Sequence, residues 1–125
     1  MRIISGKFKG RKIKYNNLQN VRPTTDRTKE SLFNILNQYF VFEEISALDL
    51  FSGSGSISYE LASRGVKKIT SVEKNIKCVR FINNFSNTLD MNLNVVNYPV
   101  FQFLNITKSK FNLIIADPPY SHSKK

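Results

Sequence analysis

The chain has 125 residues, of which 41% are hydrophobic, so it is long enough for one domain with a modest core and too apolar for a disordered protein. Its single cysteine excludes an internal disulfide, and no His, Cys and carboxylate residues have metal-ligand spacing, so we predict no metal. No apolar run approaches the roughly 20 residues of a membrane span, and no signal peptide is visible, which favours a cytoplasmic protein without a membrane partner.

The charge of the chain indicates a polyanionic partner. The formal net charge is +10, and residues 1–30 carry nine basic groups against two acids. We interpret this excess as an electrostatic surface for nucleic acid. The plain alternative is that the basic residues form only a solvated face. A third alternative is binding to an anionic membrane surface, but no amphipathic anchor accompanies the charge.

The first third of the chain predicts a hairpin, a loop and a helix. Residues 2–15 alternate in character around a glycine-containing turn, which predicts a basic β-hairpin. A polar loop with a proline follows, and a helix is predicted over 26–40, with Thr24, Thr25 and Asp26 as N-cap candidates. Its predicted core-facing residues are Leu32, Ile35, Leu36, Tyr39 and Phe40.

From residue 45 onward, short apolar runs alternate with helical patterns. The predicted strands are 45–51, 67–73, 92–98 and 111–117, and the predicted helices are 56–64, 75–89 and 99–106. This alternation predicts an α/β fold with a parallel sheet, helices on both faces and a ligand at the carboxyl ends of the strands. We expect the fourth strand to be central. The helix over 75–89 should bury Ile76, Val79, Ile82 and Phe85, with Cys78 as plain packing, and Pro99 should lie in the first turn of the last helix.

The stretch "LDLFSGSGSISYELASRG" at 48–65 predicts a ligand-binding turn. Gly53 and Gly55 allow close approach of the backbone and positive φ angles, and the following helix N-terminus favours negative charge. Glu73 lies 20 residues beyond Gly53, at the end of the next strand, where its carboxylate can accept both hydroxyls of a ribose. NAD and S-adenosylmethionine fit these features equally well.

Asp49 separates the two cofactors. A carboxylate at about 5 Å from a pyrophosphate, at an effective dielectric constant near 20, costs about 3 kcal/mol, which disfavours a dinucleotide. The same carboxylate suits the ammonium group of S-adenosylmethionine, and Ser58 occupies the slot of a third glycine. We therefore predict a site for S-adenosylmethionine. A plain strand-to-helix turn, with Asp49 paired to a basic group, is the alternative.

The sequence "DPPY" at 117–120 predicts a grip for an exocyclic amine. The Asp117 carboxylate and the Pro118 carbonyl are two acceptors on a backbone that Pro118 and Pro119 hold rigid. Tyr120 offers a flat face on which an extruded base can stack. Catalysis would then consist of positioning for in-line methyl transfer, with electrostatic help as the amine becomes cationic.

Four segments together resemble the bacterial small-subunit ribosomal RNA guanine-N2 methyltransferases. They are "MRIISGKFKGRKI" at the start, "RPTTDRTKESLFNIL" at 22–36, the glycine turn at 48–65 and "DPPY" at 117–120, in the family's order and spacing. The resemblance implies a Rossmann-like fold that binds S-adenosylmethionine. It places Asp49, Gly53 and Gly55 at the methionine part, Glu73 at the ribose, and Arg22, Thr24 and Thr25 near the cofactor or the target base.

The resemblance also implies a catalytic role for Asp117, Pro118, Pro119 and Tyr120, and an RNA-binding role for the N-terminal hairpin. The basic residues of that hairpin are Arg2, Lys7, Lys9, Arg11, Lys12 and Lys14. The chain departs from the family at Pro99, where Asp or Asn often contacts the adenine amine, so Asn97, Tyr98 or a backbone N–H must substitute. Family chains are also longer, so we expect a truncated chain that lacks the later strands of the sheet.

The sequence thus predicts one methyltransferase domain over 1–125, with 1–21 contacting RNA and 22–125 carrying the cofactor and the catalytic residues. The expected reaction is methylation of a guanine N2 amine in small-subunit ribosomal RNA, free or in an assembling subunit, by a monomer. Three alternatives remain: N6-adenine methylation of DNA, a non-catalytic RNA-binding remnant of a methyltransferase, and an NAD-linked enzyme.

Overall fold

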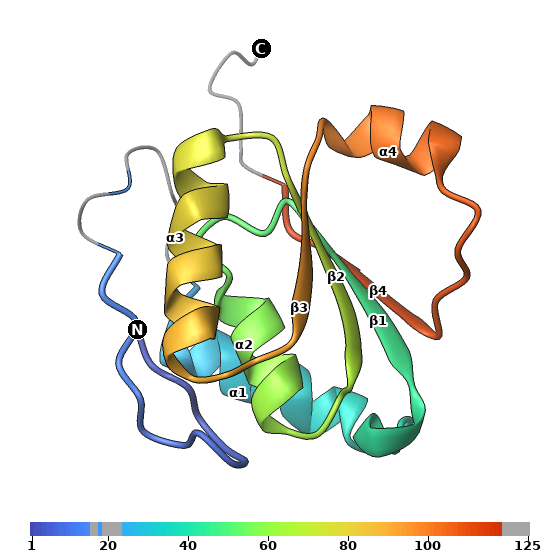
Figure 1. Cartoon of the computed structure of the whole chain (residues 1–125). Coiled ribbons are helices and arrows are strands. Elements are labelled where there is room, and N and C mark those ends of the chain that lie inside the picture. Colours follow the sequence, from blue (N-terminus) through green and yellow to red (C-terminus); the bar gives the residue numbers. More distant parts are fainter. Residues whose placement is uncertain (16–17, 19–23, 119–125) are drawn as a thin grey trace, which may run out of the picture.

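The computed structural model of the chain, drawn in Figure 1, describes residues 1–15, 18 and 24–118. Its sheet has four parallel strands in the order β3-β2-β1-β4, as predicted for an α/β fold. The strands are β1 (Ser46–Leu50), β2 (Lys68–Glu73), β3 (Leu93–Asn97) and β4 (Leu113–Ala116). Because all four run in one direction, their carboxyl ends meet at a single edge of the sheet.

Helices cover both faces of the sheet, which confirms the prediction (Figure 1). The helices are α1 (Asp26–Leu36), α2 (Ser56–Ser63), α3 (Ile76–Thr88) and α4 (Val100–Ile106), with a short 3-10 turn, η1 (Phe42–Glu44). The first three helices and the N-terminal segment pack on one face. Of the helices in the described part of the chain, α4 alone packs on the other face, where Val100 and Phe103 contact Leu48, Leu50 and Val72. No helix in the described ranges is long and apolar enough to cross a membrane.

The N-terminal segment pairs with itself as the hairpin prediction requires, but it forms no regular strands. A single antiparallel bridge joins Arg2 to Lys12. The amide of Ile3 donates to the carbonyl of Arg11 at 2.9 Å, and the amide of Ile13 donates to the carbonyl of Met1 at 3.0 Å. The side chains of Ile3 and Ile13 are buried in a cluster with residues of α2 and α3. The segment is therefore attached through its apolar side, which leaves its basic side chains outward.

Two predictions about packing faces are wrong in part. Leu32, Leu36 and Phe40 pack against the core as expected, but other predicted residues do not. Helix α1 ends at Leu36 rather than at residue 40, and Phe33 and Lys29 are its buried residues, whereas Ile35 and Tyr39 are 56% and 73% exposed. Lys29 and Phe33 lie one turn apart, so their burial turns the predicted apolar face partly toward solvent. Ile76 is also exposed, because it is the first residue of α3 and lies at the end of the helix.

The structure also tests three smaller predictions, two about helix caps and one about strand order. Thr25 caps α1, because its side-chain oxygen accepts from the amide of Thr28 at 3.1 Å. Pro99 is the N-cap of α4 rather than a residue of its first turn. Strand β4 was expected to be central, yet among the described residues it lies at the sheet edge and pairs with β1, and its Ile114 is 54% exposed. Apolar composition alone does not reveal strand order.

A buried carboxylate joins the N-terminal segment to α1 and α2. Glu60 is fully buried, and its two oxygens accept the amides of Ile4 at 2.9 Å and Ser5 at 3.1 Å. The Lys29 ammonium lies 3.4 Å from one oxygen, and the Arg64 guanidinium lies 2.7 Å from the other. Burial lowers the pKa of Lys29, and the charge of Glu60 opposes that shift. Two buried charges are tolerated here because each has a charged partner and further hydrogen bonds.

Gly6 brings the N-terminal segment against the end of α2. Its φ is +88°, and a Cβ there would lie 2.0 Å from the carbonyl oxygen of Ser63. The amide of Lys7 donates to that carbonyl at 2.8 Å, and the Ser63 hydroxyl donates to the carbonyl of Ser5 at 2.6 Å. A residue with a side chain cannot occupy this position without displacing the segment.

We expect Glu60→Gln to destabilise the fold by about 3 kcal/mol, because it leaves the Lys29 ammonium buried without its charged partner. Urea unfolding monitored by circular dichroism measures this loss. Glu30→Gln is the matched control, since Glu30 is an exposed glutamate on α1. Its free energy of unfolding should stay within about 0.5 kcal/mol of the unsubstituted chain.

A Glu60→Gln variant as stable as the Glu30→Gln control would contradict this account of the pair. A double-mutant cycle with Lys29→Met sharpens the test. The double variant should lose less free energy of unfolding than the sum of the losses in the two single variants.

Candidate functional site

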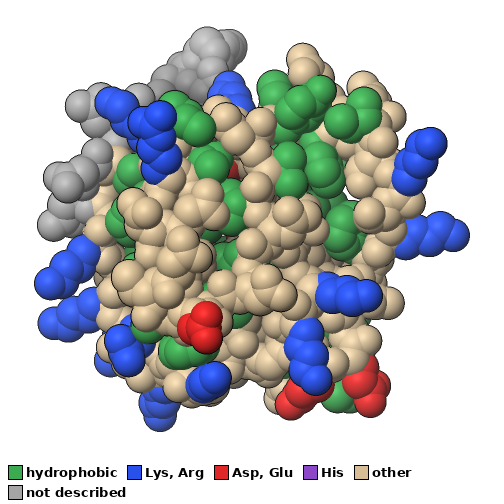
Figure 2. Space-filling model, in the orientation of Figure 1, with side chains coloured by type: hydrophobic (Ala, Val, Ile, Leu, Met, Phe, Trp, Pro, Cys, Tyr) green, Lys and Arg blue, Asp and Glu red, His purple; other side chains and the backbone are tan. Residues whose placement is uncertain are grey.

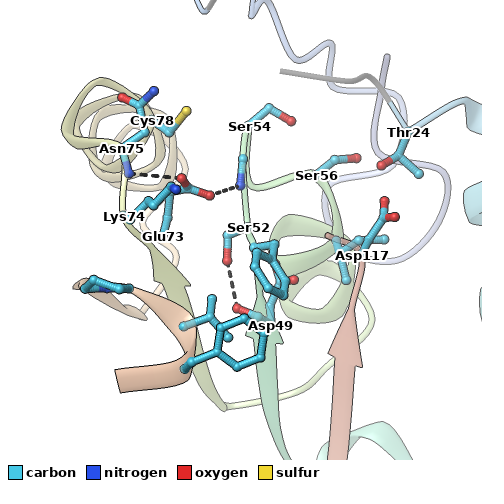
Figure 3. A pocket seen from close by; sticks show the side chains of 16 residues that line it. Thr24, Asp49, Ser52, Ser54, Ser56, Glu73, Lys74, Asn75, Cys78 and Asp117 are labelled. Carbon is cyan, nitrogen blue, oxygen red and sulfur yellow. Dashed lines mark hydrogen bonds between the residues drawn. The ribbon is translucent and has the colours of Figure 1, made fainter. Parts of the chain in front are cut away.

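A pocket of about 440 Å³ lies at the carboxyl edge of the sheet, where β1, β2 and β4 end (Figure 3). Residues from five parts of the chain line it: Thr24, Asp49, Phe51, Ser52, Gly53, Ser54, Ser56, Ile57, Glu73, Lys74, Asn75, Cys78, Pro99, Val100, Phe101 and Asp117. The predicted site residues Thr24, Asp49, Gly53, Glu73 and Asp117 are therefore brought together. Their roles toward a ligand stay predictions.

The glycine turn shapes one wall of this pocket. Both glycines have positive φ angles, +57° at Gly53 and +86° at Gly55. A Cβ at Gly55 would lie 2.6 Å from the ring of Tyr59, whose hydroxyl donates to the carbonyl of Ser54 at 2.6 Å. Gly55 does not line the pocket itself, so it acts by holding the turn in place.

Glu73 closes the opposite side of the glycine turn. Its carboxylate accepts the amide of Gly53 at 2.8 Å and the amide of Asn75 at 3.0 Å, as Figure 3 shows. Each carboxylate oxygen can accept more than one hydrogen bond, so Glu73 can still accept from hydroxyl groups of a ligand. The predicted partner of a ribose therefore lies at the pocket, in a fixed orientation.

Asp49 lines the pocket from β1 and is only 3% exposed. Its carboxylate accepts the Ser58 hydroxyl at 2.6 Å. Burial raises the pKa of Asp49 to about 7, and the charge of Glu73 adds to the rise, whereas the hydrogen bond from Ser58 opposes it. Near neutral pH the carboxyl is thus partly protonated, so the repulsion that we invoked against a dinucleotide is weaker than a full charge would give.

The fourth wall is apolar, and sequence reasoning missed it. Phe51 and Phe101 line the pocket with ring centroids 6.3 Å apart at 71°. Phe51 has a φ of +59°, which is strained for a bulky residue and costs on the order of 1–3 kcal/mol. Phe101 comes from α4 and is 74% exposed. The signal was present in "DLFSGSG" and "PVFQF", but only the fold brings the two segments together.

Asn97, the predicted substitute at the adenine amine, does not line the pocket. Its side-chain amide donates to the carbonyl of Glu73 at 3.1 Å and to that of Lys74 at 2.9 Å. It therefore holds the loop that follows β2, and its contact with a cofactor stays a prediction. Pro99 and Val100 line the pocket in its place.

The predicted catalytic tetrad lies partly within the described residues. Asp117 lines the pocket, and Figure 3 shows it on the same side as Thr24, across the glycine turn from Glu73. Pro118 is exposed and follows directly. Arg22, Pro119 and Tyr120 lie outside the described residues, and Thr25 serves as the cap of α1 rather than lining the pocket.

Cys78 was predicted to be plain packing in the helix over 75–89. It is buried, as expected, but it also lines the pocket from α3. Burial raises the pKa of its thiol to about 11, and the charge of Glu73 adds to the rise. At neutral pH the group is therefore a thiol rather than a thiolate, and it contributes shape rather than nucleophilic chemistry.

The basic residues of the N-terminal segment point outward. Figure 2 shows Lys and Arg side chains along the edge of the molecule where this segment lies in Figure 1. The exposed ones are Arg2, Lys7, Lys9, Arg11, Lys12 and Lys14. Arg2 is paired with Asp26 at 3.3 Å, so it is also a link to α1. The others are exposed, and their contact with a polyanion stays a prediction.

A family model described as "Conserved hypothetical protein 95" matches residues 1–125. The chain belongs to this family. The Haemophilus influenzae protein named ribosomal RNA small subunit methyltransferase D is 35% identical over 125 residues, which cover 96% of this chain and 64% of that protein. The methyltransferase family expected from the sequence motifs is confirmed by this match.

Two solved structures support the fold. The Escherichia coli protein yhhF has a TM-score of 0.86 at 32% identity, over 98% of this chain and 66% of that one. The Thermus thermophilus 16S rRNA N2 G1207 methyltransferase, solved with AdoMet and guanosine, has a TM-score of 0.66 at 20% identity, over 81% and 28% of the two chains. The predicted Rossmann-like methyltransferase fold is thereby confirmed. The chain spans 60–69% of the length of six curated relatives that it matches.

We expect Asp49→Asn to stabilise the ligand-free chain at neutral pH. A pKa raised from 3.8 in the unfolded chain to about 7 means that stability is lost as pH rises from about 4 to 7, by at most about 4 kcal/mol. The advantage of the Asn variant should therefore grow by about 2–3 kcal/mol between pH 5 and pH 8.

Denaturant unfolding of both chains at pH 5 and pH 8 measures this difference. The exposed Asp90 provides the matched control, because Asp90→Asn should show no such growth. An advantage of Asp49→Asn that is equal at both pH values would contradict the raised pKa.

Proposed function

We propose that the chain catalyses transfer of a methyl group from S-adenosylmethionine to the exocyclic N2 amine of a guanine in small-subunit ribosomal RNA. The observation that carries this proposal is the convergence of Asp49, Glu73 and Asp117 on one pocket with an aromatic wall. The family, and the name of the Haemophilus influenzae relative, support the reaction class.

The residues present fit the cofactor part by part. The volume of about 440 Å³ lies within the range of small-molecule pockets, about 300–1,000 Å³. Asp49 would pair with the ammonium group, Glu73 would accept the ribose hydroxyls, and Phe51 and Phe101 would flank the adenine. S-adenosylmethionine supplies a methyl group activated by its sulfonium. Beside that cation, the raised pKa of Asp49 would fall, because an opposite charge favours the carboxylate.

Asp117 and Pro118 would hold the target amine. Their two oxygens can accept the two N–H bonds of the amine, which directs the nitrogen lone pair toward the methyl group. The Asp117 carboxylate would then stabilise the positive charge that develops on the nitrogen, and it can accept the released proton. Tyr120 would stack on the base, and Pro119 would keep the turn rigid.

The N-terminal segment would bind ribosomal RNA as the phosphate-contacting part of a monomeric, cytoplasmic enzyme. In this division of labour, residues 1–21 contact RNA, free or in an assembling small subunit, and residues 22–125 hold the cofactor. Support comes from the five exposed basic residues that face outward, Lys7, Lys9, Arg11, Lys12 and Lys14. Such contacts give affinity without base specificity, so the choice of nucleotide rests with the pocket.

A methyl-transfer assay with labelled cofactor and undermethylated small-subunit particles tests the reaction. We expect label in N2-methylguanosine, and Asp117→Asn should lower kcat about 10²–10³-fold, because one aligned carboxylate is lost. The dissociation constant for S-adenosylmethionine should change little in that variant. Asp90→Asn is again the control and should keep the activity of the unsubstituted chain.

The same assay with DNA oligomers, and calorimetry with S-adenosylmethionine, RNA and NADH, test the alternatives. Label in N6-methyladenosine of DNA oligomers, rather than in RNA, would favour the DNA enzyme. RNA binding without cofactor binding would favour a non-catalytic remnant, and tight binding of NADH would favour a dinucleotide enzyme.

We expect the double variant Lys9→Glu and Lys12→Glu to weaken RNA binding and to lower the slope of log K against log salt by about 1–2, because two phosphate contacts are lost. Filter binding between 50 and 200 mM salt measures both. The control is Lys67→Glu with Lys68→Glu, an equal charge change at exposed residues near the amino end of β2. Equal losses in both double variants would show that net charge alone drives binding.

A further inference from the structure

Two serine hydroxyls stand in line behind the buried carboxyl of Asp49. The strands β1 and β2 pair so that Asp49 lies directly opposite Ser71. Ser58 comes from α2, which packs on the same face, and its hydroxyl lies 2.6 Å from Oδ2 of Asp49 and 2.6 Å from the hydroxyl of Ser71. Ser58 and Ser71 are both fully buried. The three side chains form a hydrogen-bonded row that ends at the pocket.

The direction of this row follows from counting protons. A serine hydroxyl has one proton to donate, and Ser58 donates its proton to the Asp49 carboxylate. Ser58 must then accept from Ser71, so the row runs from Ser71 through Ser58 to Oδ2 of Asp49. An O–H donor at 2.6 Å from a carboxylate oxygen is a strong, charge-assisted hydrogen bond, and a second donor behind it strengthens the first.

We propose that Ser58 and Ser71 are positioning residues that orient the Asp49 carboxylate toward the pocket and favour its ionised form for the ammonium headgroup of S-adenosylmethionine. This proposal rests on the proposed function and adds the residues that prepare the site. It also gives a reason for Ser58, which occupies the slot of the third glycine in "GSGSIS". A glycine there would leave Oδ2 without its buried donor.

Other titratable groups near Asp49 set the background for a pH test. Those facing the pocket are Glu73 at the end of β2, Lys74 after it, Cys78 on α3 and Asp117 after β4, and Tyr59 lies on α2. Burial raises the pKa of Cys78 to about 11 and raises that of Tyr59 as well, which moves both away from neutral pH. Asp49, with a pKa of about 7, titrates within the range from pH 6 to 8.5.

Calorimetry of S-adenosylmethionine binding between pH 6 and pH 8.5 tests the proposal. The unsubstituted chain should bind more tightly as pH rises through about 7, since the ligand pairs with ionised Asp49. Ser58→Ala should move this rise to higher pH. A displacement by one pH unit makes binding about 10-fold weaker at pH 6 and less than about 2-fold weaker at pH 8.5. Ser71→Ala should move it in the same direction by a smaller amount.

Two controls separate positioning from a general structural loss. 5′-Methylthioadenosine carries the adenosine and a thioether but no ammonium, so its affinity should be equal in the unsubstituted chain and in Ser58→Ala. Ser86→Ala removes another buried hydroxyl, in α3, and should leave the pH profile unchanged.

Three results would overturn the proposal. One is a loss of affinity in Ser58→Ala by the same factor at every pH, and another is an equal loss for 5′-methylthioadenosine. The third is an unchanged pKa of Asp49 in Ser58→Ala, measured on the ligand-free chain by carbon NMR of the carboxyl group. An unsubstituted chain that binds no S-adenosylmethionine at any pH rejects the proposed function itself, which distinguishes the two failures.

Discussion

The separation of charge between the pocket and the exterior is the constraint on which the rest of this molecule depends. Three acidic side chains, Asp49, Glu73 and Asp117, share one pocket in a chain with a formal net charge of +10. Asp49 is buried, Glu73 is half-buried and Asp117 is exposed, and the backbone of three different strand ends holds their carboxylates at this pocket. The interior therefore favours a small cationic ligand, whereas the exterior favours a polyanion. One domain can therefore bind a cationic ligand in its pocket and a polyanion on its surface, because the two sites carry opposite charge.

Much of the fold was accessible from the sequence, because short extended runs alternate with helical patterns, and a helix between successive strands implies a parallel sheet. Every predicted strand and helix from residue 45 onward is present. The failures arose where distant segments decide the outcome. The face of α1 was misjudged because Lys29 is buried. Its ion-pair partner, Glu60, lies on another helix and cannot be inferred from the residues around Lys29. The apolar run of β4 suggested a central strand, whereas its place at the edge of the described sheet agrees with the expected lack of later strands.

The site divides in the same way. Asp49, Gly53 and Glu73 were predictable, because each belongs to a local pattern whose chemistry can be stated from residue types and spacing. Phe51 and Phe101 were not, because their contact joins the turn after β1 to a helix after β3. The ionisation of Asp49 was also out of reach. A carboxylate in a sequence carries its ordinary pKa, and only its burial beside Glu73 reveals a group poised near neutrality.

The ammonium of Lys29 makes the N-terminal segment inseparable from the pocket. It donates to the carbonyl of Arg2 at 2.6 Å and to the hydroxyl of Ser56 at 2.9 Å, and Ser56 lines the pocket. Trimming the leading residues would therefore do more than discard a basic tail. It would expose the buried charges of Lys29 and Glu60 to water and weaken the packing at the start of α2. The first eight residues are therefore part of the packed domain, although their basic charge suggests a separate RNA-binding tail.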